Sequence, residues 1–159
     1  MFTMDSPASS SPPRSDPARP RRGEILALLK RIVRQIRNRF SDTVLIFRAD
    51  SHHCKPAVHA WCEAHNVEFV IGLGPNRALD RQFEFSFEQA KLKYKNLGKD
   101  CRVYAAGYYA ASTWERPRRV ICWINVDDFG NLDARYIVTS FKQTGAKYLY
   151  EEVYCDRGN

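Results

Sequence analysis

Asp50 is the residue of this sequence that is best placed to do chemistry. It follows a short hydrophobic run, Val44 to Phe47, which stops at R-A-D-S-H-H-C-K. Such a run predicts a buried strand of a parallel sheet, apolar on both faces. Ligands gather at the carboxyl ends of strands in open α/β sheets. A carboxylate held there suits a ligand for Mg²⁺, although the strand taken alone favours the alternative that Asp50 only caps the next loop.

A second candidate site is a group of soft ligands directly after Asp50, formed by His52, His53, Cys54, His59 and Cys62. Imidazole and thiolate groups are the usual ligands of zinc. The spacing of these residues matches no structural zinc pattern, so a small protein with a structural zinc is kept only as an alternative.

Basic residues interleaved with tryptophan form a third candidate site. Arg116, Arg118 and Arg119 surround Pro117 and follow Trp114. Arginine can hold a DNA backbone while an indole ring stacks on an unpaired base. An exposed loop, with Trp123 in the core of a hairpin, is the competing interpretation. The predicted DNA contacts also include the two cations that flank Asp50, which are Arg48 and Lys55.

The composition indicates one globular domain with an anionic partner. The chain has 159 residues, 44% of them hydrophobic, and a formal net charge of +7. A basic surface favours nucleic acid as the partner, although it also serves solubility. The five cysteines show no paired spacing and predict reduced, cytoplasmic thiols. No apolar run has the length of a membrane span, and the N-terminus does not resemble a signal peptide.

Predicted helices and strands follow one another along the chain and must position these residues. Residues 1–22 are rich in Ser, Pro and Arg and predict a disordered tail. Helical and strand periodicities then alternate and predict a βαβ unit, a long charged helix, three strands and a last helix. The predicted helices are Gly23–Phe40, Pro56–His65, Arg77–Leu97 and Gly145–Tyr154, and the predicted strands are Val44–Ala49, Val67–Leu73, Cys101–Ala111, Arg119–Val126 and Asp133–Phe141.

Several motifs in this order resemble one family. They are V-L-I-F-R-A-D-S, then K-P-A-V-H-A-W-C-E-A-H-N-V-E-F-V-I-G-L-G-P-N, then R-P-R-R-V, R-Y-I-V-T-S and L-Y-E-E-V-Y-C-D-R-G-N. Together they resemble the group-1 DDE transposases of bacterial insertion sequences. The resemblance implies an α/β fold, a partial ribonuclease H-like fold with a β-rich insertion at residues 98–142.

The resemblance also implies a chemistry and a set of residues. DDE enzymes cleave and join DNA at terminal inverted repeats, using Mg²⁺ or Mn²⁺ held by three carboxylates. The second aspartate of the family falls on Asp50. Tyr154 and Arg157 match the first half of its Tyr-x-x-Arg-x-x-x-Glu signature. A bacterial, cytoplasmic location follows, on the nucleoid when the protein is bound to DNA.

This sequence departs from the family pattern at two of the three carboxylates. The glutamate of the signature would fall past Asn159, and the tail offers only Asp5 and Asp16 in place of the first aspartate. We therefore expect residues 23–159 to be the C-terminal part of a catalytic domain, inactive as this fragment and without a tightly bound metal. The alternative is a non-catalytic DNA-binding module or an inhibitor of intact transposase subunits. We also expect the strand Val44–Ala49 to have an unpaired edge that favours aggregation.

Overall fold

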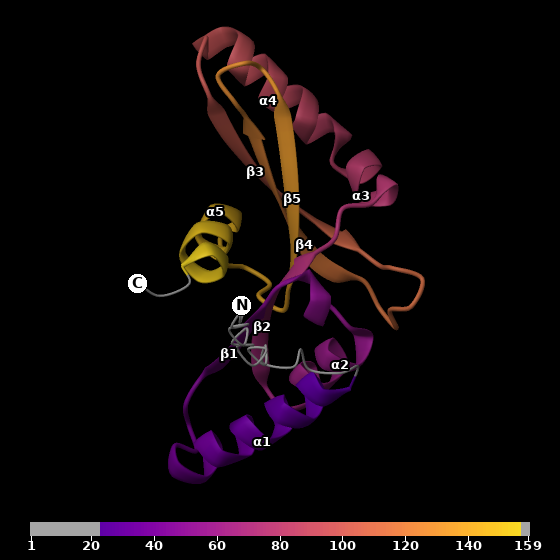
Figure 1. Cartoon of the computed structure of the whole chain (residues 1–159), viewed down its shortest axis with the longest axis vertical. Helices are drawn as coiled ribbons and strands as arrows, with labels where there is room; N and C mark the ends of the chain where they lie inside the picture. Colours follow the sequence, from indigo (N-terminus) through magenta and orange to yellow (C-terminus); the bar gives the residue numbers. More distant parts are fainter. Residues whose placement is uncertain (1–22, 157–159) are drawn as a thin grey trace, which may run out of the picture.

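The computed structural model describes residues 23–156 as a single mixed sheet with helices on both faces (Figure 1). The predicted tail, residues 1–22, and Arg157 lie outside these described residues. The five strands stand in the order β1-β2-β5-β4-β3. The α/β fold class is confirmed, and the arrangement is consistent with a ribonuclease H-like domain.

The elements lie close to the predicted ranges. The helices are α1 (Glu24–Arg39), α2 (Pro56–Ala64), α3 (Arg77–Gln82), α4 (Glu84–Leu97) and α5 (Ala146–Tyr148), with a 3₁₀ turn η1 (Ser51–His53) and a π-helix η2 (Leu149–Cys155). The strands are β1 (Leu45–Ala49), β2 (Val67–Leu73), β3 (Cys101–Tyr109), β4 (Arg118–Val126) and β5 (Leu132–Thr139). Among the helices between residues 23 and 156, none combines the length and the hydrophobicity that a bilayer crossing requires.

The N-terminal half of the sheet is the predicted βαβ unit. β1 and β2 are parallel, with Leu45 beside Val67 and Ala49 beside Ile71. The helix α2 connects them, and Pro56 occupies its first turn, where a missing N–H leaves no hydrogen bond unmade. Because the two strands are parallel, the residues that follow them lie at the same end of the sheet, the carboxyl end of both strands.

The three C-terminal strands extend the same sheet. β3, β4 and β5 form an antiparallel meander, and β5 pairs antiparallel with β2 between Val70 and Leu73. The hairpin between β4 and β5 is closed by Asp127, whose Oδ1 accepts hydrogen bonds from the backbone N–H groups of Phe129 and Asn131. Gly130 in this turn has a φ of 82°, which favours glycine.

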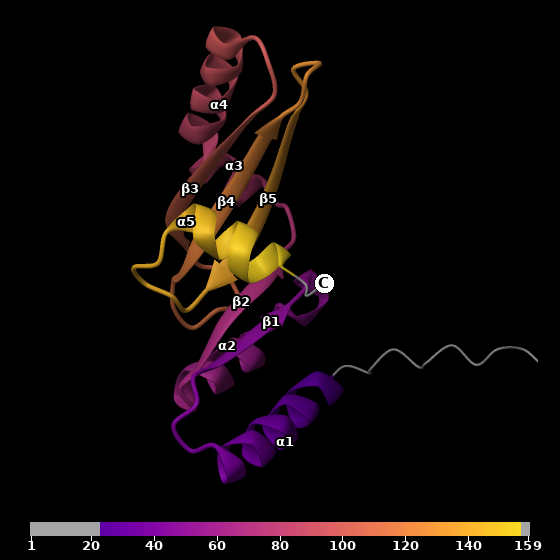
Figure 2. The same ribbon diagram turned by 90° about the vertical axis from the view of Figure 1, so that its left-hand side faces the viewer.

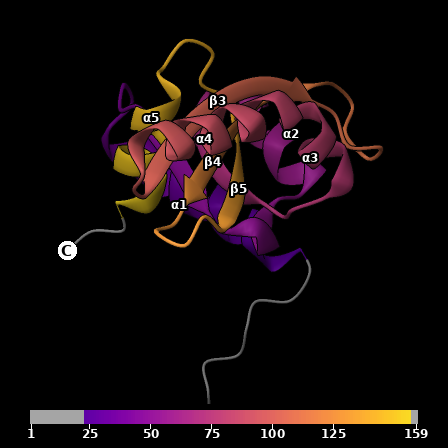
Figure 3. The ribbon, with the colours of Figure 1, turned by 90° about the horizontal axis from the view of Figure 1, so that it is seen from above.

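Two hydrophobic cores cover the two faces of the sheet. Alternate strand residues such as Phe69 and Cys122 face the larger core, which α1, α2, α3 and α4 cover. Val70 and Ile121 point the other way and pack against Leu149 and Tyr150 of η2. Figures 2 and 3 show α5 on the face of the sheet opposite to α2 and α3. The last helix therefore reaches β1 and β2 from the side that the other helices leave open.

Three sequence-based expectations need correction. β1 is not buried on both faces: Leu45, Phe47 and Ala49 pack on the larger core, whereas Ile46 points to the other face, joins neither core and is 47% exposed. The helix predicted over Arg77–Leu97 breaks at Phe83, whose ring is buried 5.8 Å from that of Tyr136. The last helix is mostly a π-helix, and a sequence pattern of three- and four-residue spacings does not distinguish this from an α-helix.

Candidate active site around Asp50

Asp50 lies at the carboxyl end of β1, as predicted. Its Oδ1 accepts a hydrogen bond from the backbone N–H of His52 at 3.0 Å, which caps η1. The imidazoles of His52 and His53 lie 3.6 and 4.0 Å from the same oxygen. The Asp50 side chain is nevertheless 50% exposed. Asp50 therefore caps η1 and still exposes its carboxylate to solvent, so the capping does not exclude a role in catalysis.

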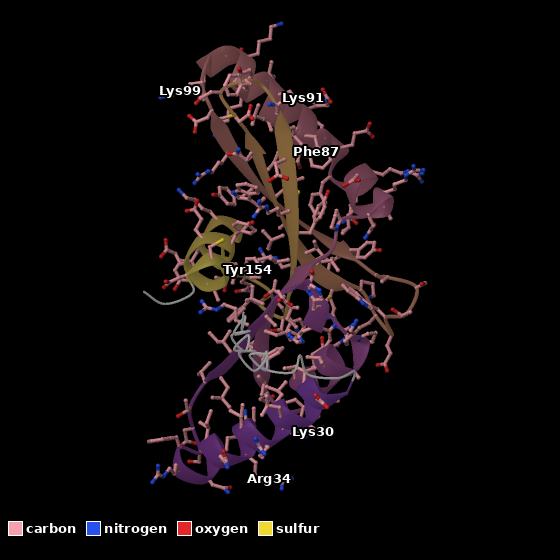
Figure 4. All side chains as sticks on the ribbon, in the orientation of Figure 1. Lys30, Arg34, Phe87, Lys91, Lys99 and Tyr154 are labelled. Carbon is pink, nitrogen blue, oxygen red and sulfur yellow. The ribbon has the colours of Figure 1, made fainter. Side chains whose placement is uncertain are left out.

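Tyr154 of η2 lies in the same hollow as Asp50. This hollow has a volume of about 410 Å³, and Ile25, Phe47 and His53 also line it. Figure 4 shows Tyr154 where the last helix meets the lower part of the sheet. The structure thus brings together two of the predicted catalytic residues, which stand more than a hundred positions apart in the sequence.

Gly72 of β2 makes this approach possible. A Cβ atom at position 72 would lie 2.5 Å from Tyr154 Oη and 3.0 Å from the backbone nitrogen of Ser51. Only glycine leaves room for the tyrosine hydroxyl and the β1–η1 turn at once. The sequence analysis did not assign Gly72 to the site, although a glycine inside a run of β-branched residues signals such a close approach.

Arg48 holds the end of the last helix. Its Nη1 donates hydrogen bonds to the carbonyl oxygens of Val153, at 2.7 Å, and Asp156. Carbonyl groups at the end of a helix have no partner within the helix, and a guanidinium group satisfies them well. Arg48 was predicted as a DNA contact, and in this structure it is also the link that keeps η2 beside Asp50.

The third candidate site, around Arg118, lines a different hollow. The side chain of Arg118 is only 4% exposed, and its Nε and Nη2 donate to the two carboxylate oxygens of Glu63 at 2.8 and 2.9 Å. Arg116 Nη2 lies 2.8 Å from Glu63 as well. Burial opposes ionisation of Glu63, but the hydrogen bonds and charges of Arg118 and Arg116 outweigh it and lower the pKa of this carboxyl group. Arg118 therefore has a structural role that its sequence pattern did not indicate.

The other members of this group differ in their accessibility. Arg119 is half-buried and donates to the carbonyl oxygens of Phe141 and Thr144 at 3.0 and 2.7 Å. Trp114 packs edge-on against His59 and Tyr109, with the guanidinium of Arg118 over its ring. Lys55 is exposed at the start of α2. Lys55 and Arg116 are thus the most accessible cations of the predicted set outside the Asp50 hollow.

Trp123 lies on the opposite face of the sheet from Trp114. Its ring stacks on that of Tyr150 at 5.5 Å, and Arg135 lies over it at 5.3 Å. The indole therefore packs against side chains of this chain. This placement agrees with the interpretation that Trp123 belongs to a hairpin core.

The histidines and cysteines after Asp50 do not gather into one group of three or more metal ligands within residues 23–156. Cys54 Sγ and His59 Nε2 lie 3.6 Å apart. His59 is fully buried and stacks on Phe69. Burial, followed by the charge of Arg118, lowers the pKa of His59 to about 4. Burial also raises the pKa of the Cys54 thiol to about 11. Among residues 23–156 no three of these side chains come together as ligands of one ion, so the alternative of a structural zinc has no support in their geometry.

The carboxylates of the described residues do not form the metal site of a DDE enzyme. Within residues 23–156, no three His, Cys, Asp or Glu side chains lie close enough to hold an ion together. Among the described residues that line the hollow beside Tyr154, Asp50 is the one with a carboxylate. One carboxylate does not hold two hard cations about 3.5–4 Å apart. The described residues therefore do not complete such a site by themselves.

The fold and the site define a mixed α/β domain that presents a carboxylate in a hollow at the end of a parallel strand. Residues 14–159 match the family described as transposase DDE domain group 1, and the chain belongs to that family. No curated protein and no solved structure matches the chain. The family confirms the resemblance and indicates a function in transposition, with DNA as the substrate and a divalent metal as the usual cofactor.

Proposed function

We propose that Asp50 is one of the metal-binding carboxylates of a DDE site for phosphodiester transfer at the terminal inverted repeats of an insertion sequence. The observation that supports this most directly is the half-exposed Asp50 in the hollow that it shares with Tyr154. A carboxylate on a rigid strand end is well oriented for a metal ion. We propose Tyr154 and Arg157 as further catalytic residues, with DNA contacts at Arg48, Lys55, Trp114, Arg116 and Arg119. Arg118, which the sequence pattern predicted as a DNA contact, is instead buried against Glu63 and leaves this set.

We also propose that this chain does not transpose DNA by itself. The described residues offer one carboxylate in the hollow, and the others must come from elsewhere in the protein or from another subunit. On this proposal residues 23–159 are the C-terminal part of a catalytic domain, with residues 98–142 as its β-rich insertion. Its place is the bacterial cytoplasm, and the nucleoid when it is bound to DNA.

Manganese binding and strand transfer test the two parts of this proposal separately. Mn²⁺ added to the labelled chain should broaden the NMR signals of His52 and His53, because they adjoin Asp50, and Asp50→Asn should abolish the effect. Asp100→Asn, an exposed acid beside β3, is the control. Broadening that persists in Asp50→Asn would refute the role of Asp50. Strand-transfer products from the chain alone would refute its inactivity.

A second candidate function is inhibition of an intact transposase. The edge of β1 is unpaired within the described sheet, and Val44 and Ile46 are 76% and 47% exposed. Exposed strand edges pair with strands of other chains. Added to an intact member of the family, the chain should then reduce strand transfer, and Ile46→Lys should relieve the inhibition. Equal inhibition by both forms would show that the β1 edge is not involved.

A further inference from the structure

A basic surface lies on α1, beyond the residue Ile25 that lines the Asp50 hollow. This helix carries five cations, Lys30, Arg31, Arg34, Arg37 and Arg39, and one acid, Glu24. Lys30 and Arg34 are exposed, and no acidic side chain among residues 23–156 lies within ion-pair distance of either. Figure 4 shows both residues on α1, at the end of the molecule opposite to Lys91 and Lys99.

Three of these cations line one groove. Lys30, Arg34 and Arg37 border a hollow of about 510 Å³ between α1 and α2. They stand one position after the buried or half-buried residues Leu29, Val33 and Ile36, so the fold fixes the side of the helix on which they lie. From Lys30 to Arg37 the helix rises about 10.5 Å, so the three cations are spread along the groove.

The other wall of the groove is aromatic. Trp61 and His65 of the α2 end line the same hollow, and their rings stack at 4.4 Å with an interplanar angle of 19°. His65 Nδ1 lies 2.8 Å from the carbonyl oxygen of Trp61, and the His65 side chain is exposed. Arg37 donates to the carbonyl oxygen of Asn66 at 3.0 Å and thereby joins the two helices at this point. The ring pair is therefore held in place beside the cations.

We propose that the α1–α2 groove, defined by Lys30, Arg34, Arg37, Trp61 and His65, binds single-stranded DNA. The cations would contact successive phosphates, and an unpaired base would stack on the exposed ring of His65. A row of cations next to a stacking ring suits a single strand, because the bases of a duplex already stack on one another. This inference rests on the proposed function, since it assigns a further contact surface for the same DNA substrate.

The binding test compares two double variants of equal charge. Lys30→Gln/Arg34→Gln removes two groove cations, and Lys95→Gln/Lys99→Gln removes two exposed cations at the α4 end. Fluorescence anisotropy with a labelled oligo-dT should show at least about tenfold weaker binding at ~50 mM salt for the groove variant. The slope of log Kobs against log [salt] should fall by about 1.4, because each single-strand phosphate contact contributes about 0.7. The α4 variant should bind like the parent chain.

Stacking has its own test at position 65. His65→Ala should weaken oligo-dT binding, whereas His65→Phe should retain it, because phenylalanine keeps a ring on Trp61. Circular dichroism checks that each variant folds. If the alanine and phenylalanine variants bind alike, the stacking contact is refuted.

Other outcomes overturn this inference in distinguishable ways. Equal binding by the two double variants would remove the groove from the DNA interface and leave the proposed function intact. Tighter binding of duplex than of oligo-dT would refute the choice of a single strand. Failure of the parent chain to bind any DNA would contradict the proposed function itself. Capture of the chain by anionic vesicles in preference to oligo-dT would identify the basic face of α1, with its exposed Leu28 and Ile32, as a membrane contact instead.

Discussion

Replacement of Glu63 by Gln should destabilise this fold more than any comparable change of a surface charge. Glu63 receives both guanidinium hydrogen bonds of Arg118 and a third from Arg116. Glutamine keeps the shape of the side chain and one acceptor but loses the negative charge. Arg118, which is 4% exposed, would then be a buried cation without a counter-charge.

The expected loss follows from the burial of the pair. Breaking a buried ion pair by removing one partner costs about 3–5 kcal/mol, because the remaining charge has no solvent to stabilise it. Glu63 is 19% exposed and Arg116 is 61% exposed, so water still reaches part of the cluster. We therefore expect the lower end of the range, about 3 kcal/mol.

Urea unfolding followed by tryptophan fluorescence measures this difference at low protein concentration, where association is limited. With a slope of about 1–3 kcal/mol per molar urea, the midpoint should fall by at least about 1 M. Glu88→Gln is the matched control, because its partner Lys91 is 58% exposed and Glu88 itself is 63% exposed. An exposed pair of this kind contributes less than about 1 kcal/mol.

A double variant separates the buried charge from the lost contact. Glu63→Gln/Arg118→Met removes the cation together with its partner, and it should recover part of the stability lost in Glu63→Gln. If Glu63→Gln loses no more than Glu88→Gln, or if Arg118→Met does not help, Arg118 is not a buried charge that depends on Glu63.

The same pair predicts how stability changes with pH. The pKa of Glu63 is lowered in the folded state by Arg118 and Arg116, against the effect of its burial. Its contribution is therefore present above the unfolded pKa of about 4.3 and is lost as the pH falls through the lower, folded value. The difference in stability between the parent chain and Glu63→Gln should shrink over that acidic window, as urea midpoints at several pH values would show.

Three further changes test the packing around Asp50. Gly72→Ala should displace the Tyr154 hydroxyl and reduce stability by about 1–3 kcal/mol, because a methyl group there would lie 2.5 Å from it; an unchanged melting temperature and an unchanged Tyr154 NMR environment would contradict this. Arg48→Met should release the end of η2, and faster amide exchange at Val153 would report it, whereas unchanged exchange would mean that the carbonyl contacts of Arg48 do not hold the helix. Ile46→Lys should reduce aggregation, because a charge on the exposed edge strand opposes pairing with other chains; light scattering that does not decrease would show that aggregation starts elsewhere.

The local signals in the sequence were sufficient for most elements. The range of β2 was predicted to the residue, and α1, α2 and the three C-terminal strands lie within a few residues of their predicted ranges. The sequence does not predict the break at Phe83 between α3 and α4, because no glycine or proline marks it. It depends on contacts with distant strands, including the hydrogen bond from Gln82 Nε2 to the carbonyl oxygen of Tyr108 at 2.9 Å.

By itself the sequence determined the α/β class, the strand that ends at Asp50 and the family to which the chain belongs. These follow from periodicity and motif order, which are local properties of the chain. Only the tertiary structure decided that Tyr154 shares a hollow with Asp50, that Arg118 is buried against Glu63 and that the cations of α1 face a stacked ring pair. The reason is physical: burial and pairing depend on which elements pack together, and that is set by contacts between residues far apart in the sequence.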